Sequence, residues 1–213
     1  MKKTIALITS IVMIILFAFP VSAESSTYGD NIKWEFDMST GTLTISGKGD
    51  MEEFPDSAPW ADYVDYIKKV VITEGVTSIS KNSFKWCKNL ESIEIPKTLT
   101  KIGNWFLECY SFRSIKIPEH IVSIEEDAFS GCPYIEKFEV DKNNKYYTND
   151  SEGVLYNKNK TVIMKFPSEH FIDNYVIPDS VEKIGSYALF SCPSLNSVTI
   201  PDNVTYIGFE ALG

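Results

Sequence analysis

The feature that most constrains this chain is an internal repeat of 22 or 23 residues. Aligning the sequence on itself gives the units ITEGVTSISKNSFKWCKNLESIEIP, IPKTLTKIGNWFLECYSFRSIKIP, IPEHIVSIEEDAFSGCPYIEKFEV and IPDSVEKIGSYALFSCPSLNSVTIP. A unit this short cannot bury its apolar side alone, so neighbouring units must stack around a shared core. The repeat therefore predicts a solenoid.

Each unit ends in a segment where apolar and polar residues alternate, as in a strand with one buried face. We expect six parallel strands on one face of a mainly β solenoid, with short helical or 3-10 corners elsewhere. The inward residues are Val70 and Ile72, Ile93 and Ile95, Ile115 and Ile117, Phe138 and Val140, Tyr175 and Ile177, and Val198 and Ile200. Other apolar columns include Ile79, Ile102, Ile124, Ile184 and Ile207, and Phe84, Phe106, Phe129, Leu189 and Leu212.

One unit departs from the period. Residues 141–176 lack the Phe-x-x-Cys corner, and their strand-like segments Val154–Tyr156 and Thr161–Lys165 flank turn residues. We expect a β-hairpin insert that protrudes from the repeat array of residues 70–213.

The ends of the array are expected to differ. Residues 24–69 predict an N-terminal cap, made of a β-hairpin with a turn ending at Gly41 and a short helix opening at Pro59-Trp60. The chain stops in mid-repeat at Gly213, so Val204, Ile207 and Leu212 would have no following rung. We therefore expect end-to-end self-association or fraying at this end, or a fragment of a longer surface protein.

Residues 1–23 read as an export signal, because two lysines precede an apolar run and Val-Ser-Ala follows it. Removal of this segment leaves 18 basic and 29 acidic residues, a net charge of −11. Such an acidic chain without a basic stripe disfavours nucleic acid and anionic membranes as partners. The expected location is outside the bacterial cell or on its surface, without membrane insertion after processing.

The four cysteines occupy one column, three residues after the Phe or Leu corner: Cys87, Cys109, Cys132 and Cys192. We expect buried free thiols, because cysteine fits a tight corner; disulfides remain the alternative in an exported protein. The spacing does not match a metal site, and no cofactor motif is present, so neither a metal nor a cofactor is expected.

No sequence pattern points to catalysis. His120 and His170 each follow a glutamate in a polar stretch away from any catalytic motif, and both are expected at the surface. The acidic residues are scattered as on a solvated face. We expect no enzyme. The rival interpretation is a secreted hydrolase with a carboxylate pair near the insert.

Two surface columns stand out. On the strands, Glu94, Lys116 and Glu139 alternate in sign and are expected to form a cross-strand ladder. Around the cysteine corner lie Trp86, Trp105, Tyr110 and Tyr134, with Trp105 in a column of small residues beside a one-residue deletion. We expect Trp105 to be pushed outward and these four aromatic residues to be the binding residues. Packing between repeats is the alternative role.

The unit IPDSVEKIGSYALFSCPSLNSVTIP, together with EGVLYNKNKTVIMKFP and the lead-in from GTLTISGKGDM to PW, resembles the bacterial BspA-like leucine-rich repeats, also called the Treponema-type class. The resemblance runs from Trp34 to Gly213. It implies a leucine-rich-repeat solenoid in a surface or secreted protein, with an adhesin-like role toward a protein or glycan on a host or bacterial surface. It identifies no ligand, since solenoid surfaces diverge while their cores repeat.

Overall fold

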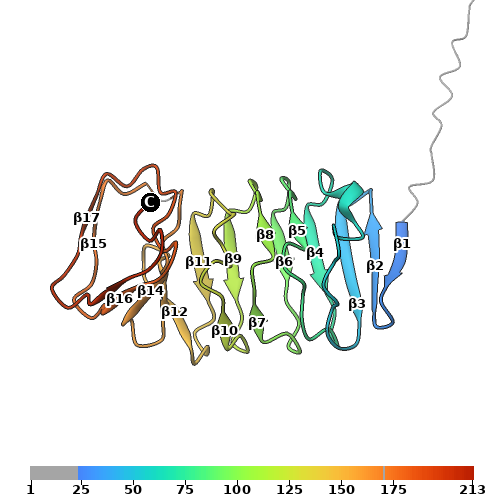
Figure 1. The fold of residues 1–213 in the computed structure, drawn as a ribbon, viewed down its shortest axis with the longest axis horizontal. Helices are drawn as coiled ribbons and strands as arrows, with labels where there is room; N and C mark the ends of the chain where they lie inside the picture. Colours follow the sequence, from blue (N-terminus) through green and yellow to red (C-terminus); the bar gives the residue numbers. More distant parts are fainter. Residues whose placement is uncertain (1–23, 170) are drawn as a thin grey trace, which may run out of the picture.

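A computed structural model describes residues 24–169 and 171–213, so the expected export signal lies outside the described residues. The chain forms a mainly β solenoid of about seven turns with almost no helix. Figure 1 shows the rungs stacked along the long axis, from β1 at one end to β15 and β17 at the other. No helix in this part of the chain has the length and apolar character needed to cross a membrane.

The N-terminal end is a small antiparallel sheet that continues into the repeats. Its strands pair in the order β1 (Glu24–Tyr28), β2 (Ile32–Asp37) and β3 (Thr42–Gly47), and β3 then pairs in parallel with the first repeat strand, β4 (Lys69–Ile72). The expected β2–β3 hairpin turns at Gly41, whose φ of 67° suits glycine. Strand β1 was not anticipated from the sequence.

Trp60 closes the first rung. It precedes the short 3-10 helix η1 (Ala61–Tyr63), is fully buried, and stacks on Phe84 with ring centres 6.3 Å apart. Its indole N–H also donates a 2.7 Å hydrogen bond to the carbonyl oxygen of Ser83. The aromatic stack and the satisfied indole together fix this segment against the first corner.

The expected strand face is present as three parallel ladders and not as one continuous sheet. The pairs are β4 with β6 (Ser92–Glu94), β9 (Ser114–Ile117) with β11 (Lys137–Val140), and β15 (Asn174–Val176) with β17 (Ser197–Thr199). The insert causes the break after β11, because the Phe138 N–H donates to the carbonyl oxygen of Gly153 instead of to the next repeat.

Two further sides complete each turn with very short strands. At one edge, β5 (Phe84–Lys85) pairs with β8 (Phe106–Leu107). At the other edge, β7 (Lys101–Ile102) pairs with β10 (Ser123–Ile124), and β16 (Lys183–Ile184) with β18 (Tyr206–Ile207). In Figure 1, β5 and β8 lie in the upper part of the ribbon and β7 and β10 lie in its lower part.

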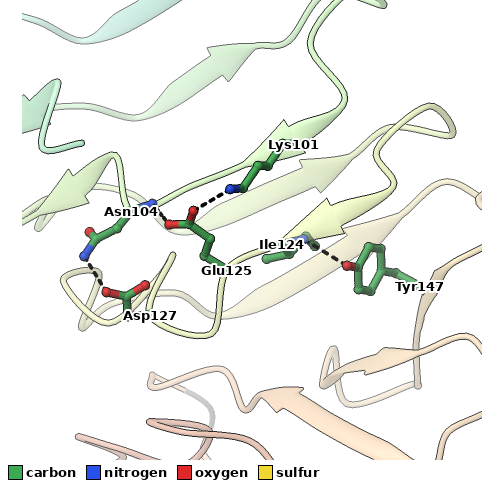
Figure 2. Close-up of polar contacts among 6 residues, drawn as sticks. All are labelled: Lys101, Asn104, Ile124, Glu125, Asp127 and Tyr147. Atoms are coloured by element: carbon green, nitrogen blue, oxygen red, sulfur yellow. Dashed lines mark hydrogen bonds and ion pairs between the residues drawn. The ribbon is translucent and has the colours of Figure 1, made fainter. Parts of the chain in front are cut away.

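Side-chain contacts join neighbouring rungs at the second edge (Figure 2). The Glu125 carboxylate forms a 2.8 Å ion pair with Lys101 and accepts the backbone N–H of Asn104 at 3.1 Å. The Lys101 ammonium lowers the pKa of Glu125 accordingly. The Tyr147 hydroxyl accepts the Ile124 N–H at 2.9 Å, which fastens the insert to the preceding rung.

The insert does contain the expected hairpin, but the expectation that it protrudes is wrong. Strands β12 (Tyr147–Asn149), β13 (Leu155–Asn157) and β14 (Val162–Lys165) form an antiparallel sheet, and β14 also pairs in parallel with β16. Ile163 lies in register with Ile184 and is fully buried. Exposing this apolar strand to solvent would be unfavourable, because the free energy gained by burying its side chains would be lost. Strand β14 therefore takes the place of the repeat strand that would otherwise pair with β16.

All four cysteines are free; Cys87, Cys109 and Cys132 are buried, and Cys192 is partly exposed. Burial raises the pKa of the Cys87 thiol well above its ordinary value, which keeps it in the unreactive protonated form. In the insert unit, which has no cysteine, the buried Lys165 ammonium donates hydrogen bonds to the carbonyl oxygens of Tyr187 and Phe190 at 2.7 and 3.2 Å.

Lys165 should make stability depend on pH. Burial lowers its pKa from 10.5 to about 8, so the folded chain holds fewer protons than the unfolded chain between these values. Stability from this group therefore rises with pH in that window. Denaturant titrations at pH 7 and pH 9 should show wild type gaining about 1.4 kcal/mol relative to Lys165→Met. An unchanged difference would mean that Lys165 keeps an ordinary pKa.

The last rung leaves apolar side chains exposed. Ile207, Phe209 and Leu212 are open to solvent, whereas Ile184 and Leu189 in the preceding unit are buried. For a chain that stops at Gly213, we propose fraying or association at this rung. Hydrogen exchange should be faster at Ile207 than at Ile184, with protection at Ile207 rising as protein concentration increases if ends associate. Equal and concentration-independent protection would contradict this expectation.

Candidate functional site

Three of the four aromatic residues singled out in the sequence form an exposed ridge along one corner of the solenoid. Trp86, Tyr110 and Tyr134 are 48%, 38% and 40% exposed and come from consecutive units. We call these three residues the aromatic ridge. Trp86 directly follows β5, and Tyr110 comes three residues after β8, which pairs with β5.

The corner backbone turns Trp86 outward. Trp86, Glu108 and Ser191 each precede the cysteine of their unit and have φ values of 64°, 58° and 55°, in the left-handed region. The Trp86 N–H donates to the carbonyl oxygen of Leu107 at 2.7 Å, so the turn is held by the next rung. A bulky side chain is uncommon at such φ values and costs of order 1 kcal/mol or more. A tryptophan at a position where it costs stability indicates a role other than stability.

Glu108 connects the first two rings of the ridge. Its carboxylate accepts the Trp86 indole N–H at 3.2 Å and the Tyr110 hydroxyl at 3.1 Å, one on each oxygen. Desolvation of Tyr110 and its bond to Glu108 raise the pKa of that hydroxyl, which stays protonated. The rings are therefore oriented before any partner arrives, which reduces the entropy that binding must remove.

Two cations lie over the ridge. The Lys85 ammonium is 4.1 Å from the centre of the Trp86 ring, and the Arg113 guanidinium is 5.0 Å from that of Tyr134. Tyr110 and Tyr134 meet edge to face with ring centres 6.1 Å apart. Tryptophan, tyrosine and arginine are the residue types that most often dominate protein interfaces. The ridge and the adjacent Arg113 together present all three.

The expected exposure of Trp105 is wrong. Trp105 is only 2% exposed and packs edge to face on Phe106, with ring centres 6.0 Å apart. The shortened loop supplies the space through Gly103, since a Cβ at Gly103 would lie 3.1 Å from the Trp105 indole nitrogen. Trp105 therefore stays in the buried column of Ser83 and Ala128 and, with Met51, lines a cavity of about 380 Å³.

The expected charge ladder on the strand face is also wrong. Glu94 pairs with Lys69 at 2.5 Å, and Glu139 pairs with Lys137 at 2.6 Å. Lys116 and Glu139 do lie opposite each other in the β9–β11 pair, but β6 and β9 are not paired, and among the described residues no ion pair joins Lys116 to either glutamate. The strand face thus carries local ion pairs that satisfy themselves.

Sequence reasoning missed a cavity at the Trp86 end of the ridge. It holds about 260 Å³ and lies between the loop before η1 and the first corner. Its apolar wall comes from Phe54, Ala58, Ala61 and Val64, and Trp86 closes the side toward the ridge. We call it the anchor cavity. No periodicity relates residues 54–64 to residue 86, so only the folded chain brings them together.

Near the insert, the Asp150 carboxylate is occupied by structural bonds. One oxygen accepts the N–H groups of Glu152 and Val154, and the other accepts the Tyr156 hydroxyl at 2.9 Å. His120, expected at the surface, has a buried ring nitrogen. Among residues 24–169 and 171–213, no three metal-binding side chains cluster as a metal site would require.

The chain is a leucine-rich-repeat solenoid, in which rungs stack and each turn adds one strand to a face. This fold typically serves as a non-enzymatic scaffold. Residues 62–176 and 161–213 match the model of the BspA type leucine rich repeat region, with six copies. The chain belongs to this family, whose members are typically surface or secreted bacterial proteins. The family suggests a protein-binding repeat module.

Solved structures agree on the fold. A leucine-rich repeat protein from Eubacterium ventriosum is 25% identical, with a TM-score of 0.63, over 89% of this chain and 63% of that one. The pneumococcal vaccine antigen PcpA is 13% identical, with a TM-score of 0.55, over 89% and 67% of the two chains. A leucine rich cell surface protein from Faecalibacterium prausnitzii is 19% identical, with a TM-score of 0.50, over 88% and 73%.

The chain thus spans about 63% of the length of the Eubacterium protein. A comparison with curated proteins gave no match.

Proposed function

We propose that this chain is an exported, adhesin-like binding module that recognises a protein on a host or bacterial surface through the aromatic ridge. The observation that carries the proposal is the exposure of Trp86, Tyr110 and Tyr134 on consecutive units beside Arg113. Exposed aromatic groups of this kind mark interaction sites, because soluble proteins otherwise bury them. Trp105 is withdrawn from the expected binding residues, since it is buried.

A protein partner fits the ridge better than a flat glycan chain. The Tyr110 and Tyr134 rings are inclined at 71°, so they do not form a coplanar platform for successive sugars. Protein side chains can fill the angle between such rings, and arginine can pair with partner carboxylates. The acidic net charge of the chain does not favour nucleic acid as a partner, and the proposal includes no cofactor.

Affinity capture tests the proposal. The mature chain and a variant with Trp86→Gly, Tyr110→Ser and Tyr134→Ser are immobilised and exposed to host matrix proteins and to bacterial surface proteins. Bound proteins are identified, and the affinity of each is then measured with purified material. We expect a partner that binds wild type and loses at least tenfold in affinity for the ridge variant, about 1.4 kcal/mol.

The control carries Lys116→Ala on the strand face and should bind like wild type. Equal affinity for wild type and the ridge variant, with both folded by circular dichroism, would contradict the proposal. Capture of glycans alone on an array would reassign the partner class.

A further inference from the structure

We infer that the anchor cavity receives one bulky apolar side chain from the protein that binds the ridge, with an acidic residue of the same segment beside it. This inference rests on the proposed function and names the chemistry of the partner. The cavity opens beside Trp86, the first residue of the ridge, so one partner segment can reach both.

The size of the cavity fixes the size of its occupant. A volume of about 260 Å³ lies just below the roughly 300–1,000 Å³ that whole small-molecule ligands take. The cavity therefore suits a single large side chain. Its wall of Phe54, Ala58, Ala61 and Val64 offers apolar contact, and Ser57, Asn82 and Ser83 add polar groups to the lining.

The wall is formed before any partner binds. Phe54 packs on Trp60 with ring centres 5.7 Å apart and also on Tyr28 at 5.0 Å. Trp60 in turn stacks on Phe84 and donates its indole hydrogen bond to Ser83, so the two sides of the cavity are tied together. A preformed pocket beside an aromatic surface is where interface anchors insert.

Charge at the rim indicates what flanks the anchor. Glu53 and Asp56 lie on the side of the N-terminal loop, whereas Lys81 and Lys85 lie on the side of the ridge. The Lys85 ammonium rests over the Trp86 ring, and none of the four ion pairs in the described ranges includes it. Arg113, farther along the ridge, is 4.0 Å from its nearest acid partner, Glu136. Both cations can turn to a partner carboxylate.

Two small probes that differ in one group test this assignment. N-acetyl-L-tryptophan carries an indole and a carboxylate, and N-acetyl-L-tryptophanamide carries the same indole without the charge. Each is titrated into the 15N-labelled mature chain while the backbone signals of Ala58 and Ala61 and the indole signal of Trp86 are followed. We expect saturable shifts at these signals, with the acid binding at least about threefold more tightly than the amide.

Two variants separate the possible outcomes. Ala61→Trp fills the cavity and should abolish the shifts caused by both probes. Lys85→Ala leaves the cavity open and should remove the preference for the acid, which keeps the test decisive if Ala61→Trp fails to fold. Absence of saturable shifts in wild type, or shifts that persist in folded Ala61→Trp, would overturn the inference.

The captured partner distinguishes this inference from the proposed function. Ala61→Trp should weaken partner binding at least tenfold, as Trp86→Gly does. If Trp86→Gly weakens binding and folded Ala61→Trp does not, the ridge is the binding surface and the inference about the anchor cavity is wrong. If neither variant changes binding, both the proposed function and this inference are wrong.

Discussion

Replacing Phe106 with alanine is expected to lower the free energy of unfolding by about 3–5 kcal/mol, the range for large aromatic deletions in a core. Phe106 is fully buried and contacts Phe84, Phe112 and Phe129 with ring centres 5.7, 5.1 and 6.4 Å apart. Because these rings come from three consecutive units, the cavity left by the substitution uncouples neighbours on both sides. Denaturant unfolding followed by circular dichroism measures the loss.

Phe171→Ala is the matched control. Phe171 is 82% exposed, so the same deletion there should change stability by no more than about 0.5 kcal/mol. Similar losses for the two variants would contradict the stacking of units around one continuous core.

Replacing Trp86 with glycine should weaken partner binding by at least tenfold while leaving stability unchanged or slightly higher. Trp86 supplies the largest exposed ring of the ridge and one side of the anchor cavity, so its loss removes an interface anchor. Glycine adopts the φ of 64° without steric cost, and this gain offsets the larger entropy of glycine in the unfolded chain. Calorimetric titration of the captured partner and thermal unfolding give the two quantities.

Lys116→Ala on the strand face is the control for affinity and should change binding less than threefold. A larger effect for Lys116→Ala than for Trp86→Gly, with both variants folded, would move the recognition surface to the strands.

The repeat predicts the rungs because burial recurs at fixed spacing. Ile79, Ile102, Ile124 and Ile184 all lie in the core, and only the terminal Ile207 is exposed. The same logic identifies the cysteine column and the outward direction of Trp86, Tyr110 and Tyr134. Periodic sequence therefore specifies which residues face inward in a solenoid.

The same reasoning does not predict the structure where the sequence departs from the repeat period. The direction of Trp105 depends on the space at Gly103, which a column alignment does not measure. The insert looks like an excursion in sequence because its spacing differs, yet β14 pairs with β16 and fills a rung. Its burial follows from Ile163 and Phe166, whose apolar character favours the core over solvent.

The anchor cavity required a contact between segments with no sequence relation. Its walls meet because Trp60 binds Ser83 and stacks on Phe84, 23 or 24 positions away. The expected ladder of ion pairs on the strand face is absent for a related reason. Strands β6 and β9 do not pair, and Glu94 and Glu139 form their ion pairs with Lys69 and Lys137. The residue types in a repeat column do not by themselves determine the register between particular rungs.

Hydroxyl-radical footprinting of the chain with and without its captured partner tests most directly whether recognition uses the aromatic ridge. The oxidation of Trp86, Tyr110 and Tyr134 is compared with that of Tyr146 and Tyr206, which are exposed outside the ridge. We predict that the partner protects the three ridge side chains and leaves Tyr146 and Tyr206 as reactive as in the free chain. Unchanged oxidation of all three ridge residues in a saturated complex would contradict the account.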